Sequence, residues 1–482
     1  MEEQSTGDVP SGGDVSCALF FPADYSVGMS NLGYHYIYRR LAELRVNVER
    51  FFALPIPYRS VESDTLLERF PIILASISFE GDLPLVIDWL RSGGIDPSRR
   101  KRPGRAPIVG AGGAITYINP LPLCGICDFI VLGDGLPVLD FLAETLKRAR
   151  SKEEALERLA EHPSILVPRV HIDRGIRGRL ETSKSPDISA EYGHGLWVTP
   201  RTTFGGTLLV ELQRGCFRRC AYCALPNCFK PPRQRDVESV KRDIMAASVR
   251  CDFSQVGLVT PEAGDYGDLN DLLSFLESSG YGVSFASLRV DNLTERAVRA
   301  LARGGRHSVT IAPESGDDEL RAACGKRFTN KDIIEKMSMA REHGIIDVKL
   351  YFMIGLPGEG DRHIASIADL CGKLRNATGQ NLTAGVSPFV PKPGSEWEEM
   401  DFAGEREIKR RYSLMSRSLK GLRGIKLRSA SARGAGAEYA LAWADSEASE
   451  RLAMGVPLKD AVSEVKRNSA ARELERLRRG VR

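Results

Sequence analysis

Residues 211–223 read Glu-Leu-Gln-Arg-Gly-Cys-Phe-Arg-Arg-Cys-Ala-Tyr-Cys and overlap the end of an apolar run, 208–212, that predicts a strand. Cys216, Cys220 and Cys223 therefore form a CxxxCxxC motif in the loop after that strand. Three thiolates can bind three irons of a cubane cluster and leave the fourth iron without a protein ligand. The motif predicts a 4Fe-4S cluster whose open iron delivers an electron to a bound substrate.

A structural zinc site is the alternative for the same three cysteines. Structural zinc takes four protein ligands, so Cys228 or a histidine would have to complete the set. The position after a strand and the spacing both favour the cluster.

Strands and helices alternate on either side of the loop, from residue 205 to residue 395. Predicted strands lie at 208–212, 255–259, 282–288, 308–312, 347–354 and 383–387, and predicted helices at 237–248, 269–278, 295–302, 332–343 and 362–374. Six strands with five helices between them describe a (β/α)6 partial TIM barrel, whose site lies at the carboxyl ends of the strands.

A separate alternation fills residues 1–160, with predicted strands at 17–21, 46–54, 71–79, 107–110 and 128–132. It predicts a parallel sheet with helices on both faces, an α/β doubly wound, Rossmann-like domain. Residues 161–204 are irregular and predict a connector. Residues 396–482 predict a small, basic, helical C-terminal extension.

Composition excludes several classes of protein. The 482 residues are 42% hydrophobic and 27% charged, as in ordinary globular proteins, and they allow two or three domains. No apolar run approaches eighteen residues and the first fifteen are polar, so neither a membrane span nor a secretory signal is expected. Ten cysteines are too sparse for a disulfide scaffold. We expect a cytoplasmic protein without membrane partners.

One basic stretch interrupts the otherwise balanced charge. Residues 406–433 contain ten Lys and Arg and one acid, Glu407. Such a stretch can bind phosphates, as on RNA, but it contains few aromatic residues for base stacking. A solvated helix face is the favoured interpretation.

The segment 208–395 resembles the radical S-adenosylmethionine (SAM) superfamily. Tyr222 supplies the aromatic residue usual before the third cysteine, and 349–359 (KLYFMIGLPGE) is similar to the family's fifth strand and its glycine turn. The resemblance implies that the open iron chelates the amine and carboxylate of SAM. Electron transfer then cleaves the sulfonium to a 5′-deoxyadenosyl radical, with flavodoxin or ferredoxin as the electron donor.

The same resemblance implies roles for polar residues at later strand ends. Glu262, in a Thr-Pro-Glu that departs from the common GGE, is expected to bind the methionine amine. Ser287 and Arg289 are expected to bind the carboxylate, and Glu314 and Ser315 the ribose hydroxyls. For each residue a helix cap or a loop hydrogen bond is the alternative.

Residues 1–160 resemble the cobalamin-binding domain found ahead of many such barrels. The positions expected to cradle the corrin and its nucleotide tail are Gly28, Ser76, Ser78, Gly112, Gly113, Gly133 and Gly135. The DxHxxG signature that supplies a cobalt ligand is missing, and the only histidine before the connector, His35, lies in a predicted helix. The resemblance therefore implies cobalamin bound without histidine ligation, although a domain that has lost its cofactor would show the same absence.

The other cysteines have two interpretations. Cys124 and Cys127, with Cys17, could hold an auxiliary cluster, but their apolar neighbours favour buried thiols. Cys228 and Cys324 could trap a substrate radical or a methyl group if they were exposed and acidic.

The whole arrangement resembles a subgroup of radical SAM proteins that contain a B12-binding domain and segments such as TIAPESG and FVPKPGS. The leading hypothesis is a transferase that moves a methyl group through cobalamin to an unactivated carbon of a small molecule or peptide. A cobalamin-independent, methylthiotransferase-like enzyme acting on RNA is the runner-up. A non-catalytic iron-sulfur redox sensor is the third hypothesis.

Overall fold

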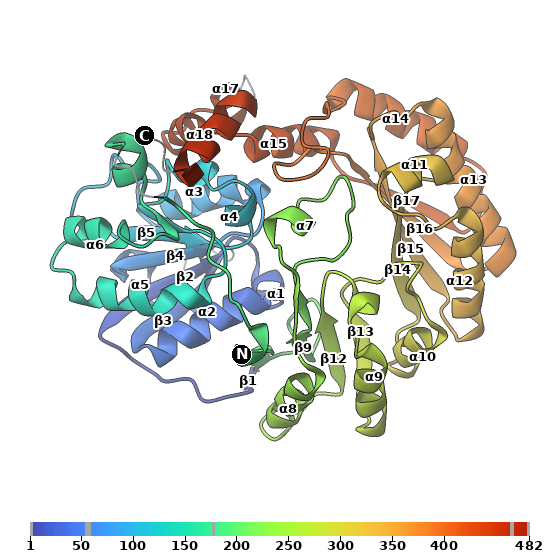
Figure 1. The fold of residues 1–482 in the computed structure, drawn as a ribbon, viewed down its shortest axis with the longest axis horizontal. Coiled ribbons are helices and arrows are strands. Elements are labelled where there is room, and N and C mark those ends of the chain that lie inside the picture. Colours follow the sequence, from blue (N-terminus) through green and yellow to red (C-terminus); the bar gives the residue numbers. More distant parts are fainter. Residues whose placement is uncertain (1–2, 54–58, 176–178, 463–466, 480–482) are drawn as a thin grey trace. The chain divides into compact units, whose positions relative to one another are not determined.

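The computed structural model describes residues 3–53, 59–175, 179–462 and 467–479 (Figure 1). The remaining positions, which include the last residue of the strand expected at 46–54, lie outside the described residues. The chain forms two compact units. The first contains residues 1–186, 195–205 and 440–482, and the second contains 187–194 and 206–439.

The first unit is built on a six-stranded sheet with the order β3-β2-β4-β5-β6-β7. All neighbours are parallel except β6 and β7. The five parallel strands follow the flavodoxin-like order, which confirms the doubly wound prediction. The strands are β2 (Val15–Phe21), β3 (Val46–Phe52), β4 (Ile72–Ser76), β5 (Ile108–Gly112), β6 (Phe129–Val131) and β7 (Ile165–Leu166).

Apolar residues are buried on both faces of this sheet. Along β2, Leu19 joins the core beneath α2 (Leu32–Glu43) and α5 (Leu136–Arg148), because alternate residues of a strand point to opposite faces. Phe20 points to the other face, where its ring stacks at 3.6 Å on Trp89 of α3 (Leu83–Ser92). Burial on both faces explains the nearly continuous apolar strand sequences.

The C-terminal helices complete the core around α3. They are α16 (Ser446–Ala453), α17 (Leu458–Ala461) and α18 (Arg467–Arg479). Asn119 Nδ2 donates to the carbonyls of Ala442 and Ala444 at 3.1 and 3.0 Å, and Ser449 Oγ donates to the Pro122 carbonyl at 2.5 Å. The expected extension 396–482 is thus divided, because only its part from residue 440 belongs to the first unit.

The second unit contains two parallel sheets, with the orders β13-β12-β9 and β14-β15-β16-β17. All six predicted barrel strands are present: β9 (Thr207–Glu211), β12 (Gln255–Val259), β13 (Gly282–Phe285), β14 (Ser308–Glu314), β15 (Asp347–Ile354) and β16 (Asn381–Pro388). The intervening helices are α8 (Val237–Ser248), α9 (Leu269–Ser278), α10 (Glu295–Arg303), α11 (Asp318–Ala323), α12 (Asn330–Glu342) and α13 (Asp361–Thr378).

A seventh strand, β17 (Ile425–Ser429), was not expected. It pairs in parallel with β16 and lies inside the basic stretch, after α14 (Glu405–Ser418). Its sequence, Ile-Lys-Leu-Arg-Ser, alternates between apolar and polar residues, which is the signal of a strand with one buried face. The surrounding charge concealed that signal. Within the described residues, the helices are too short or too polar to cross a lipid bilayer.

Candidate functional site

The cysteine loop begins where β9 ends and is flanked by β10 (Gln213–Arg214) and α7 (Leu225–Cys228). Its three cysteines are free thiols, and each is half-buried. Gly215 precedes the first cysteine with φ +82°, and a Cβ there would stand 2.7 Å from the Phe229 carbonyl oxygen. Only glycine tolerates both the backbone conformation and this close approach, so Gly215 sets the turn that presents the thiols.

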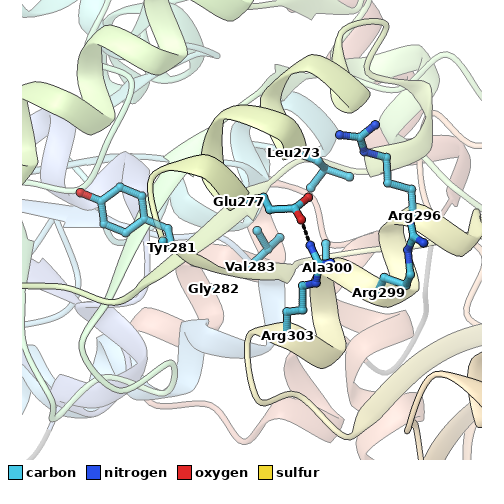
Figure 2. A pocket seen from close by; sticks show the side chains of 10 residues that line it. Leu273, Glu277, Tyr281, Gly282, Val283, Arg296, Arg299, Ala300 and Arg303 are labelled. Atoms are coloured by element: carbon cyan, nitrogen blue, oxygen red, sulfur yellow. Dashed lines mark ion pairs between the residues drawn. The ribbon is translucent and has the colours of Figure 1, made fainter.

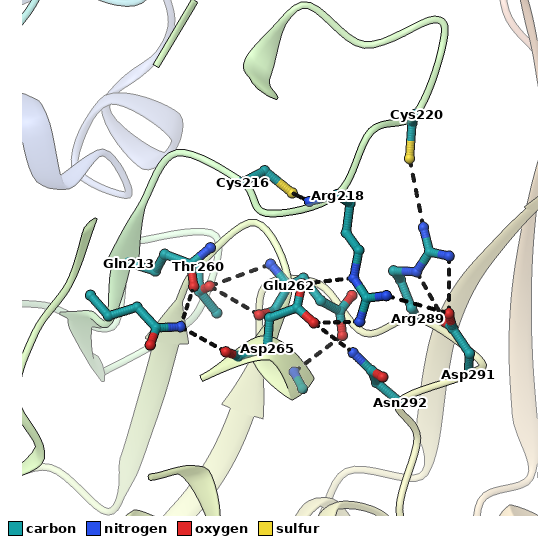
Figure 3. Close-up of polar contacts among 12 residues, drawn as sticks. Gln213, Cys216, Arg218, Cys220, Thr260, Glu262, Asp265, Arg289, Asp291 and Asn292 are labelled. Carbon is teal, nitrogen blue, oxygen red and sulfur yellow. Dashed lines mark hydrogen bonds and ion pairs between the residues drawn. The ribbon is translucent and has the colours of Figure 1, made fainter. Parts of the chain in front are cut away.

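Two N–H groups point at the sulfurs. The Arg218 backbone N–H donates to Cys216 Sγ at 3.4 Å, and Arg289 Nη1 donates to Cys220 Sγ at 3.6 Å (Figure 3). Burial raises the pKa of Cys216, and it raises the pKa of Cys223 to about 11. Metal ligation requires thiolates, and such donors stabilise the charge of ligating sulfurs.

These three thiols fit the ligand set of a cubane cluster. Within the described residues, no three His, Cys, Asp or Glu side chains gather around a single point as they would around one ion. In a cubane each thiolate binds a different iron, so its three cysteines need not meet at one point. Free, half-buried sulfurs that accept N–H donors suit that arrangement.

A network of ion pairs fixes the loop to the ends of β12 and β13. Arg218 forms a two-point ion pair with Asp265, which also accepts a 2.9 Å hydrogen bond from Asn292 Nδ2 (Figure 3). Arg289 donates from Nε and Nη2 to the two oxygens of Asp291, each at 3.0 Å. Asp265 was not predicted as a site residue, because its contacts with Arg218 and Asn292 form only on folding. Asp291 was not predicted either, because its partner Arg289 reaches Cys220 only in the folded chain.

Glu262 follows β12 and is 1% exposed. Its Oε1 accepts the Gly264 N–H at 3.1 Å, which is the local cap that the alternative interpretation expected. Its Oε2 is buried and has no hydrogen-bond partner among the described residues. Burial raises the pKa of this carboxyl group. A buried oxygen of this kind suits a cationic donor from a ligand.

The two residues expected at the methionine carboxylate differ in their surroundings. Ser287 is exposed, and its carbonyl oxygen accepts the Ala263 N–H at 3.2 Å. Arg289 is buried, and its Nε, Nη1 and Nη2 all donate to protein groups, namely Asp291 and Cys220.

Glu314 ends β14 with φ +65°, a conformation that costs energy in a residue other than glycine. Its Oε1 accepts hydrogen bonds from the Tyr222 hydroxyl at 2.6 Å and from Lys326 Nζ at 2.5 Å. Ser315 is buried, and its Oγ accepts the Asp317 N–H at 3.1 Å, which is a loop hydrogen bond. Lys326 was not expected at the site. It lies twelve residues after Glu314, and only the folding of the chain brings its ammonium group to the carboxylate.

The glycine turn after β15 is held by the basic stretch. Gly355 N–H donates to Glu359 Oε2 at 2.6 Å, and Arg411 of α14 forms an ion pair with the same oxygen. Arg410 pairs with Asp361 at 2.6 Å, and Lys409 pairs with Glu405 at 3.0 Å. The basic stretch is therefore not a uniformly solvated helix face, because the Arg411 side chain is mostly buried and pairs with the buried carboxylate of Glu359.

In the first unit, four of the expected cofactor glycines are explained by the protein itself. A Cβ added to Gly28 would lie 2.4 Å from the Phe52 ring, and one added to Gly135 would lie 2.7 Å from the Ile37 side chain. A Cβ added to Gly113 would lie 2.3 Å from the Ile77 carbonyl oxygen, and one added to Gly133 would lie 2.2 Å from the Ser183 carbonyl oxygen. The backbone approaches other protein atoms closely at these positions.

The remaining three expected positions are partly exposed to solvent. Ser76, Ser78 and Gly112 are part-exposed at the carboxyl ends of β4 and β5. In doubly wound sheets the ligand binds at the carboxyl edge, where the strand order reverses, which here is between β2 and β4. His35 is buried, and its Nδ1 accepts the Leu196 N–H at 3.0 Å.

The other cysteines of the first unit are buried thiols, as favoured. Cys17 belongs to the core on one face of the sheet, and Cys124 and Cys127 belong to the core on the other. Burial raises the pKa of Cys127 to about 12. Cys324 in the second unit is also buried, with its pKa raised to about 12, which argues against a reactive role.

A cavity of about 170 Å³ lies at the amino end of β13 (Figure 2). Three arginines of α10 line it. Arg303 forms an ion pair with Glu277, Arg296 donates to Ser274, and Arg299 lies 3.8 Å from Glu295. The barrel's chemistry is expected at the opposite ends of the strands.

Comparisons with known families match both units. The family described as the radical SAM superfamily matches residues 210–371, and that described as radical SAM proteins, N-terminal, matches residues 34–168. An uncharacterised protein of Methanocaldococcus jannaschii is 26% identical over 396 residues, 81% of each chain. The tRNA-2-methylthio-N(6)-dimethylallyladenosine synthase of Desulfitobacterium hafniense is 24% identical over 46% of this chain and 54% of its own.

Two solved structures share the fold. The methyltransferase TsrM from Kitasatospora setae, with cobalamin and a 4Fe-4S cluster bound, has a TM-score of 0.53 and 16% identity over 80% of this chain and 74% of its own. The cobalamin-dependent enzyme OxsB, with aqua-cobalamin bound, has a TM-score of 0.53 and 17% identity over 74% of this chain and 52% of its own.

Proposed function

Because the chain belongs to the radical SAM superfamily, we propose that it cleaves SAM reductively at a 4Fe-4S cluster and methylates an unactivated carbon with the help of cobalamin. The observation that carries the first part is the set of three free, half-buried thiols at the carboxyl end of β9, two of which accept N–H donors. When bound, the cluster supplies the electron that splits the sulfonium of SAM.

The residues around the loop bind and orient SAM in this proposal. The unpartnered Oε2 of Glu262 accepts a hydrogen bond from the methionine ammonium group. Tyr222 and Lys326 both donate to Oε1 of Glu314, which leaves Oε2 to accept from a ribose hydroxyl. Burial of these groups excludes water and strengthens the contacts.

The cobalamin part of the proposal draws on the shared fold with TsrM and OxsB and on the carboxyl edge of the sheet, where the strand order reverses between β2 and β4. Ser76, Ser78 and Gly112 would contact the cofactor there, without a histidine on cobalt. When bound, cobalamin carries the methyl group. The substrate would be a small molecule or peptide, and the electron donor a flavodoxin or ferredoxin. Ten free cysteines suit the reducing cytoplasm.

Action on RNA is less well supported than methyl transfer to a small molecule or peptide. The basic stretch is the only feature of the sequence that supports it, and there Arg410 and Arg411 pair with acidic residues of the barrel. The similarity to tRNA methylthiotransferases is distant, at 20% to 26% identity.

The test is anaerobic reconstitution of the full chain with iron, sulfide and hydroxocobalamin, followed by reduction with SAM that carries a deuterated methyl group. We expect one 4Fe-4S cluster, a retained corrinoid and 5′-deoxyadenosine. The variant Cys216→Ala/Cys220→Ala/Cys223→Ala should lose the cluster and the nucleoside, whereas Cys371→Ala, a buried thiol of α13, should keep both. A cluster and nucleoside retained by the triple variant would refute the assignment.

A further inference from the structure

Arg289 contacts a cluster cysteine on one side and a carboxylate on the other. Its side chain is 9% exposed, with Nη1 3.6 Å from Cys220 Sγ and with Nε and Nη2 each 3.0 Å from an oxygen of Asp291 (Figure 3). The Asp291 side chain is 32% exposed, so water screens it more than it screens Arg289.

Charge beside a ligating sulfur changes the energy of an added electron. A cationic donor on the sulfur stabilises the more negative, reduced cluster and thus raises its reduction potential. A carboxylate that neutralises this cation weakens the effect. The cation and its carboxylate partner therefore change the reduction potential of the cluster in opposite directions.

We propose that Arg289 and Asp291 form a charge pair that sets the reduction potential of the cluster through Cys220. Arg289 raises the potential, and Asp291 holds it below the value that an unpaired arginine would give. This inference rests on the cluster of the proposed function. It differs from the carboxylate-binding role that the family resemblance implies, because three of the five guanidinium N–H donors are directed at protein groups.

The test is a redox titration of the reconstituted full chain, followed by electron paramagnetic resonance in the absence of SAM. At a fixed applied potential, Arg289→Gln should lower the ratio of reduced to oxidised cluster roughly tenfold, the size expected for losing one hydrogen bond to a charged group. For a one-electron couple, this is a shift of about 59 mV to lower potential. Asp291→Asn should shift the midpoint to higher potential.

Two further variants complete the experiment. Arg289→Lys keeps the positive charge, so its midpoint potential should stay close to that of the unmodified chain. If Arg289→Gln does not incorporate iron, the midpoints of Arg289→Lys and Asp291→Asn are compared instead. Arg299→Gln, at the cavity of Figure 2, should leave the midpoint unchanged.

The outcomes separate this inference from the proposed function. Shifts of the same sign in Arg289→Gln and Asp291→Asn would overturn it and indicate a purely structural pair. An unmoved midpoint with weakened SAM binding in Arg289→Gln would also overturn it, in favour of carboxylate binding. Absence of any 4Fe-4S signal from the unmodified chain would instead contradict the proposed function and, with it, this inference.

Discussion

The Tyr222 hydroxyl donates a 2.6 Å hydrogen bond to Oε1 of Glu314. This contact joins the cysteine loop to the end of β14, and Lys326 adds a cation to the same oxygen. The carboxylate is therefore held from two segments, one before and one after it in the chain. Such a clamp can maintain the positive φ of Glu314, which would otherwise relax.

Removing the cation from this clamp should destabilise the fold. The side chains of Lys326 and Glu314 are 7% and 8% exposed, so Lys326→Met leaves a buried carboxylate without its partner. We expect the free energy of unfolding to fall by about 3 kcal/mol, measured by chemical denaturation. Adding Glu314→Gln should restore most of the loss, and the exposed Lys331→Met should change little. A double variant as unstable as the single one would contradict the pairing.

The cobalt ligation can be measured on the cobalt(II) form of the reconstituted full chain. Because His35 is buried and bonded to the Leu196 backbone, the electron paramagnetic resonance spectrum should show no nitrogen splitting from a protein histidine. The full chain is required, since residues 440–482 belong to the same unit as the sheet. Histidine splitting would contradict the ligation, and failure to retain any corrinoid would indicate a domain that has lost its cofactor.

Asp82 makes stability depend on pH. Burial raises the pKa of Asp82 to about 6, above the value near 3.9 of an unfolded aspartate. Between these values the folded state binds more protons, so stability falls as pH rises and the loss is complete above about pH 6. After allowance for solvent screening, Asp82→Asn should add about 1 kcal/mol at pH 7 and little at pH 4. Thermal unfolding at both pH values, with the exposed Asp88→Asn as control, tests this.

The two neighbouring arginines of α14 should differ in their effect. Arg411 pairs with Glu359, whose side chain is 1% exposed, whereas Arg410 makes only exposed ion pairs. Arg411→Gln should therefore lower the free energy of unfolding by about 2 kcal/mol, and Arg410→Gln should leave the unfolding midpoint unchanged. Equal effects of the two substitutions in chemical denaturation would contradict this distinction. We expect the unmodified chain to bind no single tRNA tightly, so neither substitution should remove such binding.

Local sequence predicted the parts of the fold that depend on local chemistry. The cysteine spacing and the six barrel strands could be found because each signal lies within a few residues. Lys326 and Asp265 could not, since each matters through a partner brought close only by folding.

The glycines show the same limit in another form. Gly133 was expected to let a cofactor approach, whereas the structure places the Ser183 backbone against it. A glycine in the sequence indicates that another group can approach the backbone closely there. It does not indicate whether that group belongs to a ligand or to another segment of the protein.

The first unit is assembled from the two ends of the described chain, and this affects when it can form during translation. Helix α16 covers the turn at Leu121–Leu123, and Leu441, Leu452 and Leu474 belong to the same core as Trp89. These residues leave the ribosome more than 300 positions after the turn that they cover. The apolar surface around Trp89 therefore stays exposed while the barrel is synthesised. Nascent chains should depend on chaperones until the last helices emerge.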